Sequence, residues 1–454
     1  MVSSSVGIIL SKYRALQLFC ILYNLNKRHA NGSDMPKVVV GFTGSLGSGC
    51  TTAAKHLSEK GYRCISISAD LLAPLAKKHG KPFSSGEEKQ DFGNLVRREL
   101  RSEYREDIVR GVREGGDKVV IECFRNPLEI DLLRDEYPHF YLIALFAPKH
   151  PRRDRKKIGE GEFERLDKRD EGEEDKLGQQ VRRCVNNADI VIDNSGTWNT
   201  MDDAKDFFDK IDQFVRLLEE PYRGPTEKEM LMHLAYSVSL HSICIERQVG
   251  AVIADEQYRV VSTGYNDVPQ NSESCYDLYS ECYRKIKKRK NILSIKNLNY
   301  CFVCGSELPM QVELLSEKIT IDSFKCSKCK MNLFDLIPGK DLDYCRSLHA
   351  EENAILSNPY LSSHDRRFMI FATTFPCMLC AKKIANSGIK RVVFVEPYPV
   401  EEAQEILRDN DVVIEAFEGV KSLSFNWLFR RRGKYLKESA FRRRKDLNTL
   451  LKGG

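Results

Sequence analysis

Short apolar runs rich in β-branched residues recur along the first half of the chain, each ending at a glycine or an acid. Such runs are typical of strands buried on both faces of a parallel sheet. The first run, residues 37–42, leads through a glycine-rich loop into a helical stretch that begins at Ala53. Further runs lie at residues 64–68, 119–122, 140–146 and 188–194. Strands in this order, with helices between them, predict a parallel α/β domain over residues 36–220.

A second set of patterns begins after a linker with proline and glycine at residues 219–225. Thr226 and Glu229 have the spacing of a capping box, so we expect a helix from there to about residue 241, with Met230 and Leu231 on its buried face. Five strands are expected, at residues 249–253, 260–266, 368–373, 391–396 and 412–417. They predict a second α/β domain over residues 226–454, with an insertion at residues 271–344.

Composition narrows the class of protein. The chain has 454 residues, of which 42% are apolar and 30% charged, and a net charge of +6 that permits anionic substrates without arguing for extensive nucleic-acid binding. Fifteen cysteines, an odd number and partly in Cys-x-x-Cys pairs, favour reduced, metal-binding thiols in a cytoplasmic protein. The most apolar run, residues 15–25, is too short to span a membrane, and residues 1–35 are interpreted as an N-terminal extension.

The strongest chemical signal is His349-x-Glu351, followed by Pro376-Cys377-x-x-Cys380. One imidazole and two thiolates give zinc three ligands in a tetrahedral site and leave its fourth position for water. Glu351 is not a ligand in this arrangement, and we expect it to transfer protons. A purely structural zinc site would leave the position of Glu351 unexplained, whereas this spacing is the signature of zinc-dependent nucleobase deaminases. We therefore predict a hydrolytic enzyme.

A glycine-rich loop follows the first strand and contains Gly44, Gly47, Gly49, Cys50, Thr51 and Thr52. Strand, loop and helix start in this order form a nest of backbone amides that binds phosphate, as in P-loops. Thr51 offers a hydroxyl for Mg²⁺, but Cys50 stands where the P-loop motif has lysine, so we favour a nucleotide-binding regulatory domain over an active kinase. A simple tight turn is the alternative.

The segment that contains this loop, roughly residues 36–215, resembles the P-loop nucleoside and nucleotide kinases, including dephospho-coenzyme A kinase. In those proteins, arginines such as those at residues 152–157 form a lid over the phosphates. The charge-dense stretch at residues 152–176 is most simply a mobile, solvated segment, with the lid as the alternative.

Two more Cys-x-x-Cys pairs lie in the insertion, with 21 residues between them: Cys301 with Cys304, and Cys326 with Cys329. Four thiolates saturate a tetrahedral zinc and leave no open position, so this spacing predicts a structural zinc ribbon. Redox pairing is the alternative. No role follows from the sequence for Cys275, Cys282 and Cys345.

Four motifs together resemble the deoxycytidylate deaminases: IERQVGAV at residues 245–252, TGYN-x-x-P at 263–269, HAE-x-NA at 349–354 and PC-x-x-C at 376–380. Placed behind a P-loop kinase-like domain, over about residues 36–420, the layout resembles the bacterial anti-phage dCTP/dCMP deaminases. The resemblance implies a cytidine deaminase-like α/β/α fold in the second domain. It also implies conversion of dCTP or dCMP to deoxyuridine nucleotides, which deprives phage of cytosine nucleotides.

Three residues are candidates for substrate binding. The resemblance places Asn266 on the deoxyribose, with a role in the turn as the alternative. Arg247 could serve a phosphate or a helix end, and Tyr398 could contact base or sugar or simply pack at the sheet edge.

The combined prediction is a zinc-dependent deoxycytidine nucleotide deaminase that forms a homo-oligomer, with a regulatory nucleotide or an inhibitory RNA as a further partner. One alternative is a deaminase of cytidine or adenosine in RNA or single-stranded DNA, which basic runs such as residues 284–290 would suit. Another is a nucleotide- or RNA-sensing protein whose deaminase is latent.

Overall fold

In the computed structural model, the described residues are 36–173, 175–196, 198, 202–293, 300–301, 304–307, 326, 328–329, 344–360, 367–396, 401–433 and 436–437. They fall into two compact units, one within residues 1–226 and 417–454 and the other within residues 227–416. Across these ranges, no helix combines the length and the apolar run needed to cross a membrane. The expected N-terminal extension lies outside the described residues.

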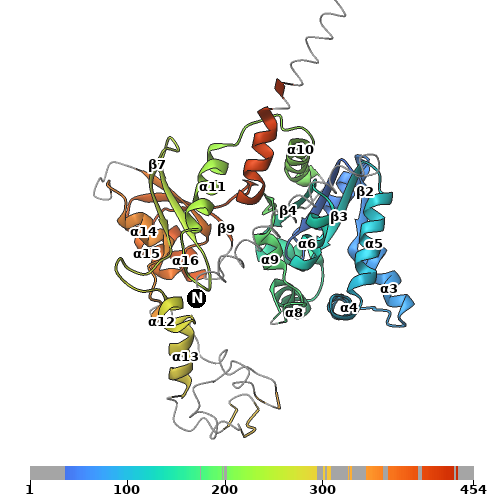
Figure 1. Ribbon diagram of the computed structural model, residues 1–454, viewed down its shortest axis with the longest axis horizontal. Helices are drawn as coiled ribbons and strands as arrows, with labels where there is room; N and C mark the ends of the chain where they lie inside the picture. Colours follow the sequence, from blue (N-terminus) through green and yellow to red (C-terminus); the bar gives the residue numbers. More distant parts are fainter. Residues whose placement is uncertain are drawn as a thin grey trace, which may run out of the picture. The chain divides into compact units, whose positions relative to one another are not determined.

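The first unit is built on a six-stranded sheet in the order β11-β5-β4-β1-β3-β2 (Figure 1). Its strands are β1 (Val38–Thr43), β2 (Arg63–Ser66), β3 (Lys118–Phe124), β4 (Phe140–Phe146), β5 (Ile190–Asp193) and β11 (Gly419–Val420). All neighbouring strands are parallel except β11, which runs antiparallel to β5. All six residues of β1 are buried, because β1 lies between β3 and β4 and helices cover both faces. The five strands expected from the sequence are confirmed.

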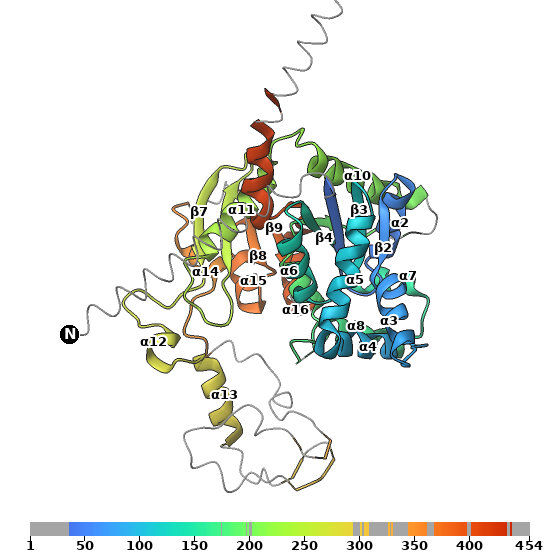
Figure 2. The same cartoon turned by 45° about the vertical axis from the view of Figure 1, so that its right-hand side comes forward.

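Helices cover the two faces of this sheet. The helices α2 (Cys50–Glu59) and α10 (Lys205–Glu219) pack on one face, and α5 (Arg101–Glu114) and α6 (Pro127–Glu136) pack on the other (Figure 2). The helix α9 (Val181–Asn186) packs beside α6. The remaining elements are α3 (Ala73–Lys78), α4 (Gly86–Glu99), α7 (Lys149–Lys156), α8 (Glu160–Glu171), a π-helical turn (Ile67–Leu72) and a 3₁₀ turn (Asp202–Ala204). In α10, Phe207, Ile211 and Phe214 recur at helical spacing and are buried, which explains how this helix joins the core.

The second domain ends earlier than the expected boundary at residue 454. The described residues after 416 belong to the first unit, where β11 extends the sheet and residues 422–433 are helical. Lys421 anchors this return because its side chain is buried and its Nζ donates hydrogen bonds to the carbonyl oxygens of Val185 and Asn186, at 3.1 and 2.7 Å. A two-residue edge strand is too short to produce a recognisable sequence pattern, and the prediction missed it for this reason.

The second unit contains a five-stranded sheet in the order β10-β9-β8-β6-β7. Its strands are β6 (Gly250–Asp255), β7 (Val260–Tyr265), β8 (Phe368–Thr374), β9 (Ile389–Glu396) and β10 (Val413–Ala416). Strands β8, β9 and β10 are parallel, whereas β6 is antiparallel to both β7 and β8. All five strands coincide with those expected from the sequence to within a few residues.

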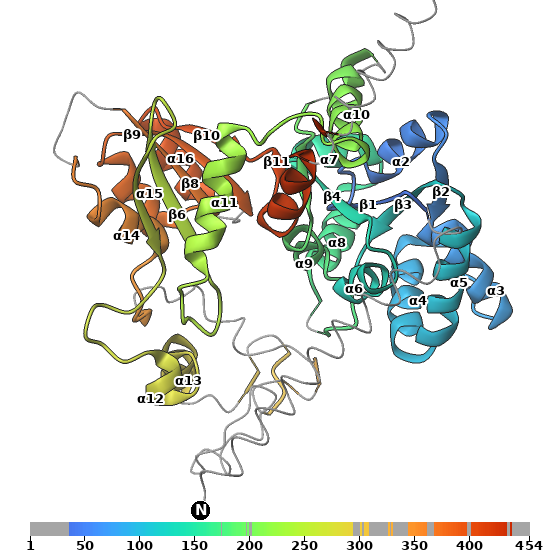
Figure 3. The same ribbon diagram turned by 45° about the horizontal axis from the view of Figure 1, so that its top comes forward.

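Helices lie on both faces of the second sheet. Figure 3 shows α11 (Glu227–Ser239) on one face, with α14 (Ala350–Leu356), α15 (Met378–Ala385) and α16 (Glu401–Asp409) on the other. Two further helices, α12 (Cys275–Tyr279) and α13 (Tyr283–Leu293), lie in the first part of the insertion. The prediction for the buried face of α11 was wrong for Met230, which is 52% exposed, because Met232 occupies the core instead.

Candidate metal centre and active site

Three predicted ligands meet where two helices begin. His349 is the N-terminal capping residue of α14, and Cys377 holds the same position in α15. Cys380 lies one turn into α15, so its thiol faces the same way as that of Cys377. The Nδ1 atom of His349 is 3.3 Å from the Sγ atoms of both cysteines. The helix α15 connects the parallel strands β8 and β9, and the pairing of these two strands fixes the position of both thiols.

The geometry of this trio fits zinc. With Zn–S bonds of about 2.3 Å and Zn–N bonds of about 2.0–2.1 Å, tetrahedral coordination places sulfur and nitrogen about 3.5 Å apart. The three ligand atoms all lie within 4.8 Å of one another, and both cysteines are buried. A hydrogen bond with Cys380, with the His349 imidazole beside it, lowers the pKa of Cys377 to about 4. The site therefore offers a thiolate before any metal binds, as zinc coordination requires.

Glu351 lies against this centre without belonging to the ligand set. Its side chain is only 4% exposed, and the Cys380 thiol donates a hydrogen bond to Glu351 Oε2 at 3.6 Å. Burial raises the pKa of this carboxyl, so it takes up a proton more readily than an exposed glutamate does. The next residue, Glu352, points elsewhere: it pairs with Lys383 at 2.6 Å and accepts a hydrogen bond from the backbone N–H of His349. One helix turn therefore gives two adjacent glutamates different environments.

Hydrogen bonds from side chains to the backbone hold α14 tightly against the sheet. The side-chain Nδ2 of Asn353 donates to the carbonyl oxygen of Tyr265 at 2.8 Å, and the Ser262 hydroxyl donates to the carbonyl oxygen of Ala354 at 2.7 Å. At Gly264 a Cβ atom would come within 2.3 Å of the backbone of α14. Only glycine permits this close approach, which places His349 and Glu351 beside α15.

Cys345, for which the sequence predicted no role, interacts with His349. A hydrogen bond between these two side chains is the main reason why the pKa of His349 rises to about 10, with Cys377 adding to the effect. Metal-ligating histidines usually donate their second N–H to a partner that fixes the ring. A cysteine four residues before the histidine was the only signal in the sequence.

Two of the three candidate substrate-binding residues, Asn266 and Arg247, lie among the described residues and contact each other. The Asn266 side chain is buried, accepting from the N–H of Val249 at 2.7 Å and donating to the carbonyl oxygen of Arg247 at 2.9 Å. The Arg247 guanidinium pairs with the Glu396 carboxylate at the end of β9. Asn266 therefore shapes the loop that carries Arg247. Tyr398 lies outside the described residues.

The insertion brings its four predicted cysteines together. Their Sγ atoms all lie within 4.8 Å of one another. Cys301 is 3.5 Å from Cys329, and Cys304 is 3.6 Å from Cys326. Tetrahedral zinc with four bonds of about 2.3 Å would place its sulfurs about 3.8 Å apart, so the arrangement can hold a closed zinc site.

In the first unit, the glycine-rich loop connects β1 to α2 as expected. Gly47 has φ +84°, and a Cβ there would lie 2.4 Å from the carbonyl oxygen of Arg152. Arg152 is itself buried and donates to the carbonyl oxygen of Leu46 at 2.9 Å, so the prediction of a solvated segment is wrong for this residue. The Cys50 side chain lies in the core, which leaves only its backbone N–H for a ligand. Thr51 is exposed at the start of α2.

Comparison with known proteins agrees with this geometry. The family model for the cytidine and deoxycytidylate deaminase zinc-binding region matches residues 225–396. The deoxycytidylate deaminase of Enterobacteria phage T4 is 32% identical over 168 residues, which cover 37% of this chain and 77% of the phage protein. A UPF0200 protein of Methanothermobacter thermautotrophicus is 28% identical over 199 residues, covering 42% of this chain and 99% of that protein.

Among solved structures, the dCMP deaminase of cyanophage S-TIM5, in complex with dCMP and dUMP, is 20% identical with a TM-score of 0.25. The matched region covers 43% of this chain and 99% of the cyanophage chain. The phage T4 relative, matched over most of its length, and the zinc-binding family region that contains His349, Cys377 and Cys380 settle the family. The chain belongs to the deoxycytidylate deaminases, a zinc-binding family of nucleotide-deaminating enzymes.

Proposed function

We propose that this protein hydrolyses the 4-amino group of a free deoxycytidine nucleotide, dCMP or dCTP, and releases a deoxyuridine nucleotide and ammonia. The observation that carries the proposal is the convergence of His349 Nδ1 with two thiols, with the buried Glu351 carboxyl against them. Two thiols and one imidazole leave room for a fourth ligand, which distinguishes this site from the four-cysteine group.

Each residue has one task in this reaction. His349, Cys377 and Cys380 would hold zinc, which as a Lewis acid would supply a nucleophilic water at neutral pH. Glu351 accepts the first proton of the attacking water and delivers it to ring nitrogen N3, and then takes the proton of the new C4 hydroxyl and delivers it to the departing amino group. The C4–N bond breaks, a C4 carbonyl forms and ammonia leaves. Because Glu351 is buried, bulk water does not compete with it for this proton.

The same unit offers features suited to a free nucleotide. Arg247 is 40% exposed in its side chain even while it pairs with Glu396, so the guanidinium can face an anionic substrate. Asn266 holds the backbone of this arginine in place. We propose that Arg247 binds a phosphate of the substrate and that Asn266 binds its deoxyribose. Tyr398 is a third candidate for substrate binding, at the base or the sugar.

The test is release of ammonia from dCMP, dCTP, CMP, CTP and a cytosine-containing oligonucleotide by the full chain loaded with zinc. Turnover of dCMP or dCTP, with the ribonucleotides and the oligonucleotide untouched, is the expected result. Deamination of the oligonucleotide alone would replace the proposal with a polynucleotide editing enzyme. Lack of activity on all five, with zinc bound, would favour the latent-sensor alternative.

We further propose that the first unit binds a regulatory nucleotide with Mg²⁺ at the loop containing Gly44, Gly47 and Gly49. The loop follows the central strand β1, and the chain continues to β2 on one side and later to β4 on the other. Loops at such a switch point, outside the carboxyl ends of parallel strands, are common ligand sites in α/β proteins. Thr51→Val should weaken binding of a nucleoside triphosphate with Mg²⁺ to the full chain, and unchanged affinity would count against the site.

We also propose a role for the cysteines of the insertion and a biological role for the whole protein. Cys301, Cys304, Cys326 and Cys329 form a closed structural zinc site that stabilises the insertion. Depletion of cytosine nucleotides by a cytoplasmic homo-oligomer during phage infection is the role that the two-domain layout favours, with a nucleotide or an inhibitory RNA as the regulator. Reduced protection against phage by a Glu351→Gln strain would support that role, and undiminished protection would contradict it.

A further inference from the structure

Two thiols lie close together beside the glycine-rich loop of the first unit. Cys50 begins α2 directly after this loop, and Cys123 lies near the end of β3. Helix α2 packs against β3, and Cys123 packs against the buried cluster that contains Cys50. The two side chains interact directly, and both thiols are free of disulfides. Neither the deaminase centre nor the four-cysteine group of the insertion uses them.

An irregularity in β3 places the sulfur of Cys123 at the start of α2. Within residues 121–124, β3 has one residue more than the paired segment of β1, which makes a bulge. The Thr43 hydroxyl donates to the carbonyl oxygen of Phe124 at 2.9 Å and holds this bulge in place. The Cys123 sulfur lies 3.8 Å from the hydroxyl oxygen of Thr51, in the first turn of α2.

The backbone of Cys123 is strained at this bulge. Its φ is +66°, in the left-handed region that residues with a Cβ atom seldom adopt. A residue held there costs about 1–3 kcal/mol, and such strain is found mostly at functional positions. Glycine would avoid the cost, whereas cysteine presents a sulfur atom to its neighbour.

We propose that Cys50 and Cys123 form a redox-active pair, which a hydroperoxide converts into a disulfide. The two members have different surroundings, as an attacking and a resolving thiol require. Cys123 is half-buried, and Arg125 supplies a positive charge nearby, the environment in which thiols are reactive. Cys50 is only 5% exposed, so a hydroperoxide meets Cys123 first.

The reaction has two steps. The Cys123 sulfur attacks the hydroperoxide and forms an S–O bond, while the O–O bond breaks and an alcohol leaves, or water where the oxidant is hydrogen peroxide. The Cys50 sulfur then attacks the oxidised sulfur, and the hydroxyl group leaves as water with the Cys50 proton. Two thiols together lose two electrons and two protons, and the hydroperoxide is reduced by the same two electrons.

The disulfide would join α2 to β3 at the loop where we place the regulatory nucleotide. The Cys50 sulfur is 3.5 Å from the Ser48 hydroxyl, and the Asn194 amide donates to the carbonyl oxygen of Ser48 at 2.7 Å, so this sulfur belongs to the packing of the loop. Drawing the two sulfurs to bonding distance shifts the start of α2, whose N–H groups would face a phosphate. We expect weaker nucleotide binding after oxidation. This consequence rests on the proposed nucleotide site, whereas the disulfide itself does not.

The first test needs no variant. The full wild-type chain, loaded with zinc, is treated with a limiting amount of hydrogen peroxide, alkylated, and mapped by mass spectrometry without reduction. Cys64 is the internal control, because it is also half-buried and free and lies in the neighbouring strand β2. We expect a cross-linked peptide containing Cys50 and Cys123, formed at least tenfold faster than Cys64 is oxidised and removed by dithiothreitol. Oxidation of Cys123 without the cross-link, or no faster than that of Cys64, would overturn the proposal.

Three variants test the order of the two steps. Cys50→Ser should leave a sulfenic acid on Cys123, which dimedone labels, because the resolving thiol is absent. Cys123→Ser should leave Cys50 reduced at the same dose of peroxide. Cys64→Ser is the matched control and should form the cross-link as the wild type does. Oxidation of Cys50 to the wild-type extent in Cys123→Ser would contradict the role of Cys123 as the attacking thiol.

Binding of ATP with Mg²⁺ to the reduced and the oxidised full chain tests the consequence for the loop. We expect at least fivefold weaker binding after oxidation, with recovery in dithiothreitol. Equal affinity of the two forms would overturn the effect on the loop. Absence of binding to the reduced protein would refute the nucleotide site and with it this effect, whereas the cross-link decides the thiol pair separately.

Discussion

Replacing Glu351 with glutamine separates proton transfer from metal binding. The amide has nearly the same shape as the carboxyl, so it can occupy the buried space against Cys380 and leave the three zinc ligands in place. It cannot accept and deliver a proton as a carboxylate does. We therefore expect Glu351→Gln to keep its zinc and to lose most of its turnover.

The size of the loss follows from the burial of the side chain. A positioned general acid–base group contributes roughly 10²- to 10⁴-fold to a rate, which corresponds to about 2.7–5.5 kcal/mol of the activation barrier. At 4% exposure, Glu351 is shielded from the solvent that could replace it. The upper half of this range, a drop in kcat of about 10³- to 10⁴-fold, is therefore the expected result.

Glu352→Gln is the matched control, because it changes the adjacent residue of the same helix in the same way. Its partner Lys383 is 43% exposed, and a partly exposed ion pair of this kind contributes about 0–1 kcal/mol to stability. We expect kcat of Glu352→Gln to stay within a few-fold of the wild type. The assay measures dUMP or dUTP formation alongside zinc content. Glu351→Gln activity within tenfold of the wild type at full zinc occupancy, or an equal loss in both variants, would refute the proton-transfer role.

Three further predictions concern stability and can be checked by chemical or thermal unfolding. Gly47→Ala should destabilise the first unit by about 1–3 kcal/mol, because the new Cβ would clash with Arg152. Gly61→Ala is the control: Gly61 has a similar φ but no atom within 4 Å of a Cβ, so this change should cost about 1 kcal/mol. Equal losses of stability in the two variants would contradict the clash. Burial lowers the pKa of Lys421 to about 7, so the unfolded state binds the extra proton above that pH. The free energy of unfolding should therefore rise between pH 7 and about pH 10, by at most about 1.4 kcal/mol per pH unit. Lys421→Met should remove this pH dependence, and an unchanged pH dependence in Lys421→Met would show that other groups cause it. Asn266→Asp removes an amide donor and places a carboxylate against a backbone carbonyl, so it should cost about 1–3 kcal/mol and raise KM; a neutral effect would show that the loop does not depend on this amide.

The sequence alone determined the strands and the chemistry of the centre. Buried strands carry short apolar runs because both faces are covered, so ten of the eleven strands among the described residues could be located from hydrophobic residues and turn signals. The motifs that contain His349 and Cys377 predicted a zinc site, because their residue types and local spacing suit the coordination of one tetrahedral ion. Short-range spacing is preserved in any fold that builds a helix there, which is why this part of the site was predictable.

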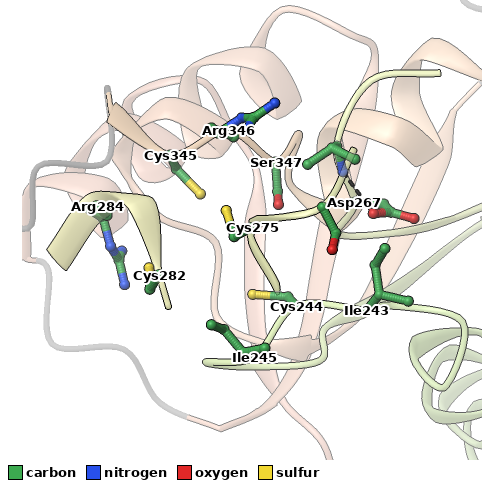
Figure 4. A pocket seen from close by; sticks show the side chains of 12 residues that line it. Ile243, Cys244, Ile245, Asp267, Cys275, Cys282, Arg284, Cys345, Arg346 and Ser347 are labelled. Atoms are coloured by element: carbon green, nitrogen blue, oxygen red, sulfur yellow. Dashed lines mark hydrogen bonds between the residues drawn. The ribbon is translucent and has the colours of Figure 1, made fainter. Parts of the chain in front are cut away.

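Only the tertiary structure decided which distant segments meet. Residues after 416 return to the first unit because Lys421 and β11 find partners around β5, which no local pattern encodes. The buried face of α11 depends on which methionine the sheet covers. Cys244, Cys275, Cys282 and Cys345 span more than a hundred residues, yet line one cavity (Figure 4). Long-range packing brings such residues together, and their separation in sequence carries no signal of that contact.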